Sequence, residues 1–112
     1  MLAKLNRLKK KKDFGKVFKH GKGAKQDFLA LKFNKNNLKN SRFGFVVSSK
    51  VSKKAVVRNK VKRRLRESVR SKLDRIKKGF DIVFITFEKI KEKDFEQINS
   101  LVEKILKRSK LL

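Results

Sequence analysis

The residues best suited to chemistry are the cations of one stretch, AVVRNKVKRRLRESVR, which runs from Ala55 to Arg70. At about 100° per residue, most of its polar side chains fall on one arc of a helix, and its apolar side chains form the adjoining stripe. The arc consists of Arg58, Asn59, Lys62, Arg63, Arg66 and Arg70. Because guanidinium groups bind phosphates bidentately and stack on bases, the pattern predicts a helix face that binds nucleic acid.

An ordinary surface helix in so basic a chain would also carry a charged face. Three features favour the binding face. The arc uses Arg where the chain mostly uses Lys, its one uncharged polar residue is Asn59, and Glu67 falls outside it. With no carboxylate inside the arc, we expect its charges to be left for an external partner.

Groups that could perform catalysis are sparse. His20 is the only histidine, and its place beside a helix end favours a capping or surface role. The chain has no cysteine, and its ten carboxylates are scattered without a pair suited to acid–base work or to metal binding. The stretch FGKVFKHGKGAK lacks the GK[ST] of a phosphate-binding loop. We therefore predict no catalytic side chain and no metal held by protein side chains.

Two phenylalanines, Phe14 and Phe18, stand one helical turn apart among several lysines. Residues at this spacing share one helix face. The face could pack in the core, or it could offer stacking surfaces to unpaired bases with cations beside them. Spacing alone favours packing in the core.

Hydrophobic periodicity predicts the elements that must position these residues: a helix, two or three strands, a helix, a strand and a helix, in a single α+β domain. The expected elements are a helix at about Lys12–His20, strands in QDFLALKFN and RFGFVVSS, a helix from Ala55 to about Ser71, a strand in FDIVFITF, and a helix in KDFEQINSLVEKILKR. The nearly all-apolar FDIVFITF is expected at the sheet centre, and the last helix is expected to begin at Asp94, with Gln97 completing its cap.

The connections are also predicted. The polar stretch NKNNLKNS is expected to join the first two strands as a hairpin loop, and a stretch that includes Val51 is a candidate extension of the second strand. We expect residues 1–112 to form one domain that begins with a basic, extended segment at about residues 1–11.

Composition limits the class of partner. The formal net charge of +25 far exceeds what solubility needs, so an acidic partner is expected. Nucleic acid is favoured over a membrane surface, because the basic residues run through the whole chain and no apolar run approaches about 18 residues. The lack of cysteine and of a secretory signal favours a cytoplasmic location.

The run RNKVKRRLRE, from Arg58 to Glu67, resembles the RNR signature of the bacterial ribonuclease P protein family. The fixed positions of that signature are filled by Arg58, Asn59, Lys62, Arg63 and Arg66. The resemblance continues in NRLKKKKDFGKVFKHG, RFGFVVSSKVSKKAVV and GFDIVFITF, so that it covers nearly the whole chain in the right order.

The resemblance implies a small αβββαβα sandwich on a mixed sheet, like the second domain of ribosomal protein S5. It also implies a left-handed βαβ crossover, although the general rule favours the right-handed form. The implied function is that of the protein subunit of ribonuclease P, an endonuclease that removes the 5′ leader of precursor tRNA. The implied partners are the ribonuclease P RNA, which performs the hydrolysis, and precursor tRNA, with Mg²⁺ acting on the RNA subunit and the substrate.

The same resemblance assigns roles by position. It places the RNR face against the catalytic RNA, and the leader in a cleft between the first helix and the sheet. The implied cleft residues are Phe14, Phe18, Leu31, Ser48 and Lys50. Further basic contacts are implied at Arg7, Lys12, Lys16 and Arg42. For the two phenylalanines, the cleft role now replaces pure core packing.

Two departures from the family pattern affect these assignments. Leu31 stands where the family often has an aromatic residue, so apolar contact is expected there in place of base stacking. The connection SSKVSKKA is one residue longer than the usual SKKVGKA and has Ser52 where glycine is common, which leaves the alignment of Ser49 to Lys54 open.

Two other functions stay open on sequence grounds. A structural RNA-binding protein, such as a small ribosomal protein, would share the charge and the size. A protein-only nuclease would need a cluster of carboxylates, which the sequence does not offer.

Overall fold

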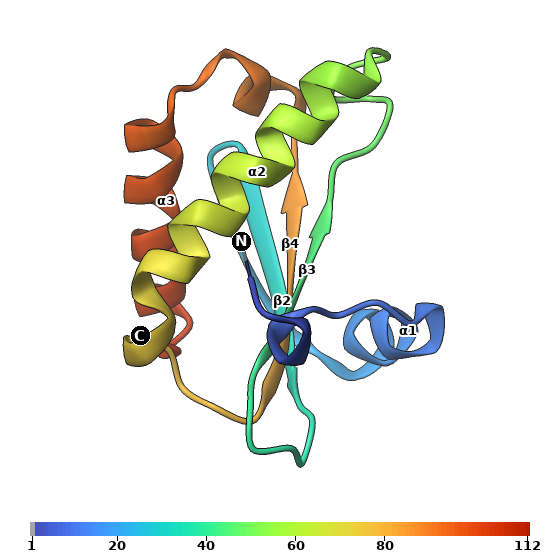
Figure 1. Cartoon of the computed structure of the whole chain (residues 1–112), viewed down its shortest axis with the longest axis vertical. Coiled ribbons are helices and arrows are strands. Elements are labelled where there is room, and N and C mark those ends of the chain that lie inside the picture. Colours follow the sequence, from blue (N-terminus) through green and yellow to red (C-terminus); the bar gives the residue numbers. More distant parts are fainter. Residues whose placement is uncertain (1) are drawn as a thin grey trace.

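The order of helices and strands in the computed structural model, which describes residues 2–112, is αβββαβα, as expected (Figure 1). The elements are α1 (Lys11–His20), β1 (Lys22–Gln26), β2 (Leu29–Lys35), β3 (Arg42–Val46), α2 (Ala55–Lys72), β4 (Phe80–Thr86) and α3 (Phe95–Arg108). Short 3₁₀ segments lie at Lys4–Asn6, Leu73–Arg75 and Glu88–Glu92. The capping box at the start of α3 is confirmed, since Asp94 and Gln97 each accept a backbone N–H of the other.

The four strands form one mixed sheet in the order β1-β2-β4-β3. β4 lies in the interior, antiparallel to β2 and parallel to β3, which confirms the central position expected for the most apolar strand. In Figure 1, α2 lies in front of the sheet, β3 and β4 point upward, and β4 lies to the left of β3. The β3–α2–β4 crossover is therefore left-handed.

The strand expected in QDFLALKFN is confirmed as β2, which begins at Leu29, but the stretch turns at Asp27, whose φ is 52°, and Gln26 belongs to β1. Two other expectations about the strands are wrong. The loop after β2 does not close a hairpin, because β4 lies between β2 and β3. Val51 does not extend β3; it lies in a turn, where its side chain is buried in the core.

One face of the sheet packs on α2 and α3 and holds the main core. Alternate strand residues meet apolar side chains of both helices there because strand side chains alternate between faces. The members include Leu29, Leu31, Phe43, Ile82, Phe84, Val61, Leu65, Val69, Ile98, Val102 and Ile105. This layer fixes the position of α2 against the sheet.

The other face of the sheet carries α1 and a smaller core of Leu8, Val17 and Val83. Phe14, Val46 and Ile85 pack against that cluster and stay partly exposed. Since α1 contacts β2 and β4 and the cluster is small, part of this face is left open.

The chain before α1 is folded against the sheet. The sequence predicts an extended segment at about residues 1–11, of which Met1 lies outside the described residues. Leu2 and Leu8 are buried. Arg7 forms a parallel bridge with Phe43, and the Leu8 N–H donates to the Phe43 carbonyl at 2.9 Å. The segment thereby covers the edge of β3, whose unpaired backbone groups would otherwise face solvent.

Candidate nucleic-acid interface

The basic arc of α2 lies beside the stripe that anchors the helix. Val61, Leu65 and Val69 are buried in the main core. Of the arc, Asn59, Arg63 and Arg70 are exposed, and Arg58, Lys62 and Arg66 are half-buried. Because the apolar stripe is fixed in the core, the side chains of the arc extend from a helix whose position is fixed. The neighbouring positions of stripe and arc agree with the helical spacing of the sequence.

Two arginines of the arc have partners inside the chain. Arg58 donates from Nη1 to the Ser52 carbonyl at 2.8 Å. Arg70 lies 3.5 Å from the Glu67 carboxylate, so the expectation that Glu67 leaves every arginine unpaired is wrong. That pair is exposed at both ends and contributes little stability. Lys62, Arg63 and Arg66 make no hydrogen bond or ion pair with any residue from 2 to 112.

A row of side chains crosses the α1 face of the sheet in register. Lys25 pairs with Ala30, Ala30 with Ile85, and Ile85 with Val46. Lys25 is exposed and the other three are half-buried, so the row is an open floor beside α1. Ala30, Ile85 and Val46 were not among the residues predicted from the sequence, because the period-two pattern of a strand does not show which of its two faces meets α1.

The two phenylalanines of α1 occupy different environments. The Phe14 ring packs against Gly44, where a Cβ atom would lie only 2.5 Å from two ring carbons. Phe18 is 40% exposed. Phe14 therefore serves mainly the small core, while Phe18 keeps an exposed aromatic surface on α1, whose last turn is tied to β2 by Lys32.

The predicted position of Leu31 in the cleft is wrong. Its side chain is fully buried on the opposite face, in the core shared with α2 and α3. Its neighbours Ala30 and Lys32 point to the α1 face instead, and Lys32 donates from Nζ to the Phe18 carbonyl at 3.2 Å. Strand alternation shows which residues share a face, but not which face meets α1.

Ser48 and Lys50 follow β3 at the end of the sheet next to Val46, and both are exposed. The Ser48 hydroxyl accepts the Lys50 N–H at 3.3 Å, and its carbonyl accepts the Val51 N–H at 3.0 Å. Val51 is buried in the main core, which fixes this turn just beyond the end of β3. Ser48 and Lys50 therefore lie near Val46 at the same end of the sheet.

Arg42 was predicted as a basic contact, but its charge is engaged inside the protein. Its Nε and Nη2 donate to the two carboxylate oxygens of Asp81 at 2.8 and 2.7 Å, and its Nη1 lies 3.4 Å from Asp13 of α1. The hydrogen bond to Asp81 raises the pKa of Arg42 above its usual value. Arg42 thus ties β3, β4 and α1 together.

The remaining predicted cations border both surfaces. Lys12 and Lys16 are exposed on α1. Arg7 donates from Nε to the Leu2 carbonyl at 2.8 Å. Together with Phe14, Lys62 and Arg66, Arg7 lines a hollow of about 280 Å³ at the edge of β3. The basic arc of α2 and the α1 side of the sheet therefore meet around this edge.

Within residues 2–112, no group of three or more acidic or histidine side chains could hold a metal ion. His20 is exposed at the end of α1. No helix in the same range is long and apolar enough to cross a membrane. The described arrangement is suited to neutralising phosphates and stacking bases.

Comparison with known proteins agrees with this arrangement. The family model described as Ribonuclease P matches residues 2–110. A ribonuclease P protein component from Caldanaerobacter subterraneus is 40% identical over 111 residues, which cover 99% of this chain and 95% of the relative. Another, from Clostridioides difficile, is 42% identical over 103 residues, covering 91% and 90%.

Solved structures of similar proteins share the fold. The RNase P protein from Thermotoga maritima superimposes with a TM-score of 0.83 at 40% identity, covering 91% of this chain and 96% of the other. A mutant of the Staphylococcus aureus RNase P protein with defective mRNA degradation activity gives 0.91 at 31% identity, covering 97% and 92%. Sequence and structure together show that the chain belongs to the bacterial ribonuclease P protein family.

Proposed function

We propose that the chain serves the ribonuclease P holoenzyme by binding two RNAs at once: the catalytic RNA on the basic arc of α2, and the 5′ leader of precursor tRNA on the floor beside α1. The observation that carries the proposal is the connection between the two surfaces. Lys62 and Arg66 of the arc line the same hollow as Phe14 of α1. One protein can therefore hold the leader against the RNA that cleaves it.

On the arc, the cations without internal partners are the ones available to phosphates. Lys62, Arg63 and Arg66 meet this condition within the described chain, and Arg58 is oriented by the Ser52 carbonyl. Each RNA phosphate neutralised should contribute about 0.7 to 0.9 to the slope of log affinity against log salt. Assembly with the catalytic RNA should thus weaken steeply as salt rises.

On the floor beside α1, the geometry suits a single strand. Phe18 offers an aromatic surface, and Lys25 offers a cation at the far side of the floor. Between them, the paired residues Ala30 and Ile85 form an apolar surface. Stacking and phosphate contact read few base edges, so leader binding should tolerate many sequences.

The hydrolysis itself is assigned to the RNA subunit. Mg²⁺ would act on that RNA and on the substrate, as the resemblance to the family implies. The chain's contribution is to bind, orient and neutralise charge, which favours the cleavage-competent complex. A cytoplasmic location belongs to the same proposal, since precursor tRNA is the expected substrate.

Reconstitution tests the proposal. The purified protein is added to a bacterial ribonuclease P RNA, and cleavage of precursor tRNA is measured at a Mg²⁺ concentration too low for the RNA alone. We expect the protein to stimulate cleavage at the mature 5′ end and to be inactive without the RNA. Absence of stimulation, or cleavage by the protein alone, would refute the proposal.

A further inference from the structure

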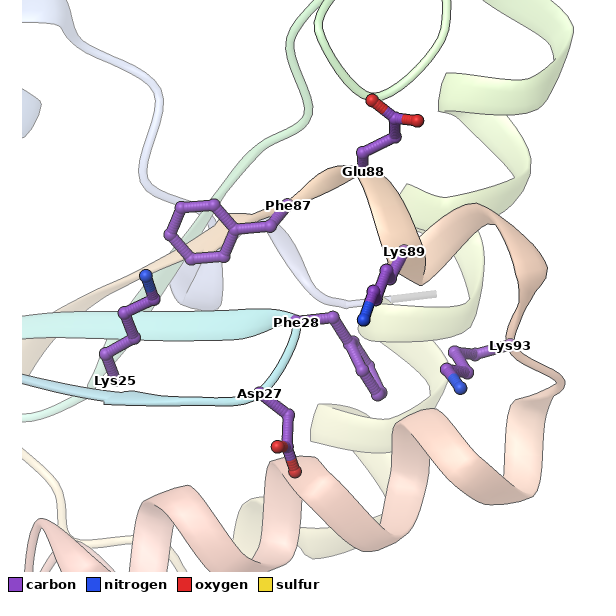
Figure 2. Close-up of a pocket in the computed structure, with 7 residues that line it drawn as sticks. All are labelled: Lys25, Asp27, Phe28, Phe87, Glu88, Lys89 and Lys93. Carbon is purple, nitrogen blue, oxygen red and sulfur yellow. The ribbon is translucent and has the colours of Figure 1, made fainter.

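A second aromatic and basic site lies at the end of the sheet where β4 stops and β2 begins. Figure 2 shows this pocket, which has a volume of about 540 Å³. Such a volume lies within the range of small-ligand sites, roughly 300–1,000 Å³. Its lining residues are Lys25, Asp27, Phe28, Phe87, Glu88, Lys89 and Lys93.

The pocket holds two phenylalanines in fixed relation. The Phe87 N–H donates to the Phe28 carbonyl at 3.1 Å, which continues the pairing of β2 and β4 by one step. Phe28 packs partly on the main core, whereas Phe87 is 37% exposed. A large aromatic ring is thus presented to solvent on a rigid backbone.

Three ammonium groups accompany the rings. The Lys25 Nζ lies 4.5 Å from the centre of the Phe87 ring, and the Lys93 Nζ lies 5.7 Å from the centre of the Phe28 ring. Figure 2 shows Lys89 directed toward Phe28. Lys93 is also tied to α2, because its carbonyl accepts a hydrogen bond from Arg64 at 2.7 Å.

The two carboxylates of the lining do not cancel these charges. In Figure 2, Asp27 points toward α3 and Glu88 points away from both rings. Glu88 lies 3.7 Å from Lys91, which is outside the pocket lining. The space around the rings is therefore aromatic and cationic.

We propose that this pocket binds an unpaired nucleotide of single-stranded RNA, with the base stacked at Phe87 and the phosphates beside Lys25, Lys89 and Lys93. A flat aromatic base and an adjacent anion match the two properties of the pocket together. A lipid headgroup or an acidic peptide would match only the charge.

The path to the pocket identifies which strand can reach it. Lys25 belongs both to the pocket and to the open row on the α1 face. Along β4, Phe87 lies four residues beyond Val83, roughly 13 Å at about 3.3 Å per residue. The nucleotide is therefore a leader residue farther from the cleavage site than those near Phe18, an assignment that rests on the proposed function.

A fluorescence experiment tests the pocket directly. The chain contains no tryptophan and no tyrosine, so a Phe87→Trp variant carries a single reporter. Phe95, at the start of α3, is 39% exposed and does not line the pocket, so Phe95→Trp is a matched control. Unlabelled oligoadenylate should quench the first variant saturably and leave the second unchanged. No quenching, or equal quenching of both, would overturn the proposal.

A binding experiment in the reconstituted holoenzyme tests the leader assignment. Phe87→Ala should weaken binding of a long-leader precursor tRNA about tenfold, the loss of one stacked base, and leave a short-leader precursor unaffected. Lys89→Ala should weaken the long-leader precursor more than does Lys104→Ala, which removes the same charge from the exposed face of α3. Equal losses for long and short leaders would overturn the assignment.

These outcomes are distinct from failure of the proposed function. Stimulation of cleavage by the unaltered protein is measured on the short-leader precursor, which does not reach the pocket. If stimulation is absent there, the proposed function fails. If stimulation is present and the Phe87 variants behave like their controls, only the pocket proposal fails.

Discussion

Replacement of Arg42 by methionine separates an internal ion pair from an RNA contact. In the structure the guanidinium bridges Asp81 on β4 and Asp13 on α1. Asp81 is buried, and its other hydrogen bond comes from Asn36 Nδ2 at 2.9 Å. The Arg42→Met variant therefore leaves a buried carboxylate without its cation, while the methionine keeps most of the packing of the arginine stem.

The size of the effect follows from the burial of the pair. Removing one partner of a buried ion pair costs about 3–5 kcal/mol. The Arg42 side chain is 23% exposed, so water compensates in part, and the lower value of about 3 kcal/mol applies. At roughly 4 °C per kcal/mol for a domain slightly longer than 100 residues, the melting temperature should fall by about 12 °C.

Urea unfolding followed by circular dichroism measures this loss. Arg63→Met is the control, since Arg63 is exposed and has no partner among residues 2–112, and it should change stability by less than about 0.5 kcal/mol. The double variant Arg42→Met/Asp81→Leu should be more stable than Arg42→Met alone, because it removes the unpaired charge. Unchanged stability of Arg42→Met, with loss of RNA affinity alone, would refute the internal role.

Three further predictions concern single features. Arg63→Ala combined with Arg66→Ala should weaken assembly with the ribonuclease P RNA and reduce its salt slope, as measured by filter binding; an unchanged slope would contradict phosphate contact. Phe18→Ala should weaken binding of precursor tRNA and spare mature tRNA, so equal losses would contradict a leader contact. Lys72 is 3% exposed, and burial lowers its pKa. The unfolded chain then binds this proton more tightly, so stability should rise with pH between the lowered pKa and about 10.5, and Lys72→Met should remove that rise in urea titrations.

The helical parts of the molecule could be read from the sequence because their signal is local. Over the 18 residues of α2, the period of 3.6 distinguishes the buried valines from the arc around Arg63. The cap of α3 follows from Asp94 and Gln97 alone. By contrast, β1 has the sequence KGAKQ, in which Ala24 is the one partly buried apolar residue. The strand therefore shows no alternation of apolar and polar residues, and its pairing with β2 holds it in the sheet.

The parts that could not be predicted depend on contacts between distant residues. Arg42 and Asp81 are 39 positions apart in the sequence. An arginine and an aspartate at such a separation can form an internal ion pair or can both face solvent, and the sequence does not show which. Leu31 was assigned to the wrong face because alternation is symmetrical until the position of α1 is known. The sequence does not indicate a binding role for Phe87, because that role depends on Phe28 and Lys25, which lie beside Phe87 only in the folded sheet.

The interior position of β4 has a consequence for the order in which the newly made chain can fold. β2 and β3 are synthesised early, but each needs β4 as its neighbour, and β4 ends at Thr86. Until that residue has left the ribosome, both strands keep an unpaired edge, and the valines of α2 have no complete sheet to cover. Such edges invite pairing between chains. A nascent chain that stops short of β4 should therefore be protease-sensitive and prone to self-association, and these properties should disappear together once the strand is complete.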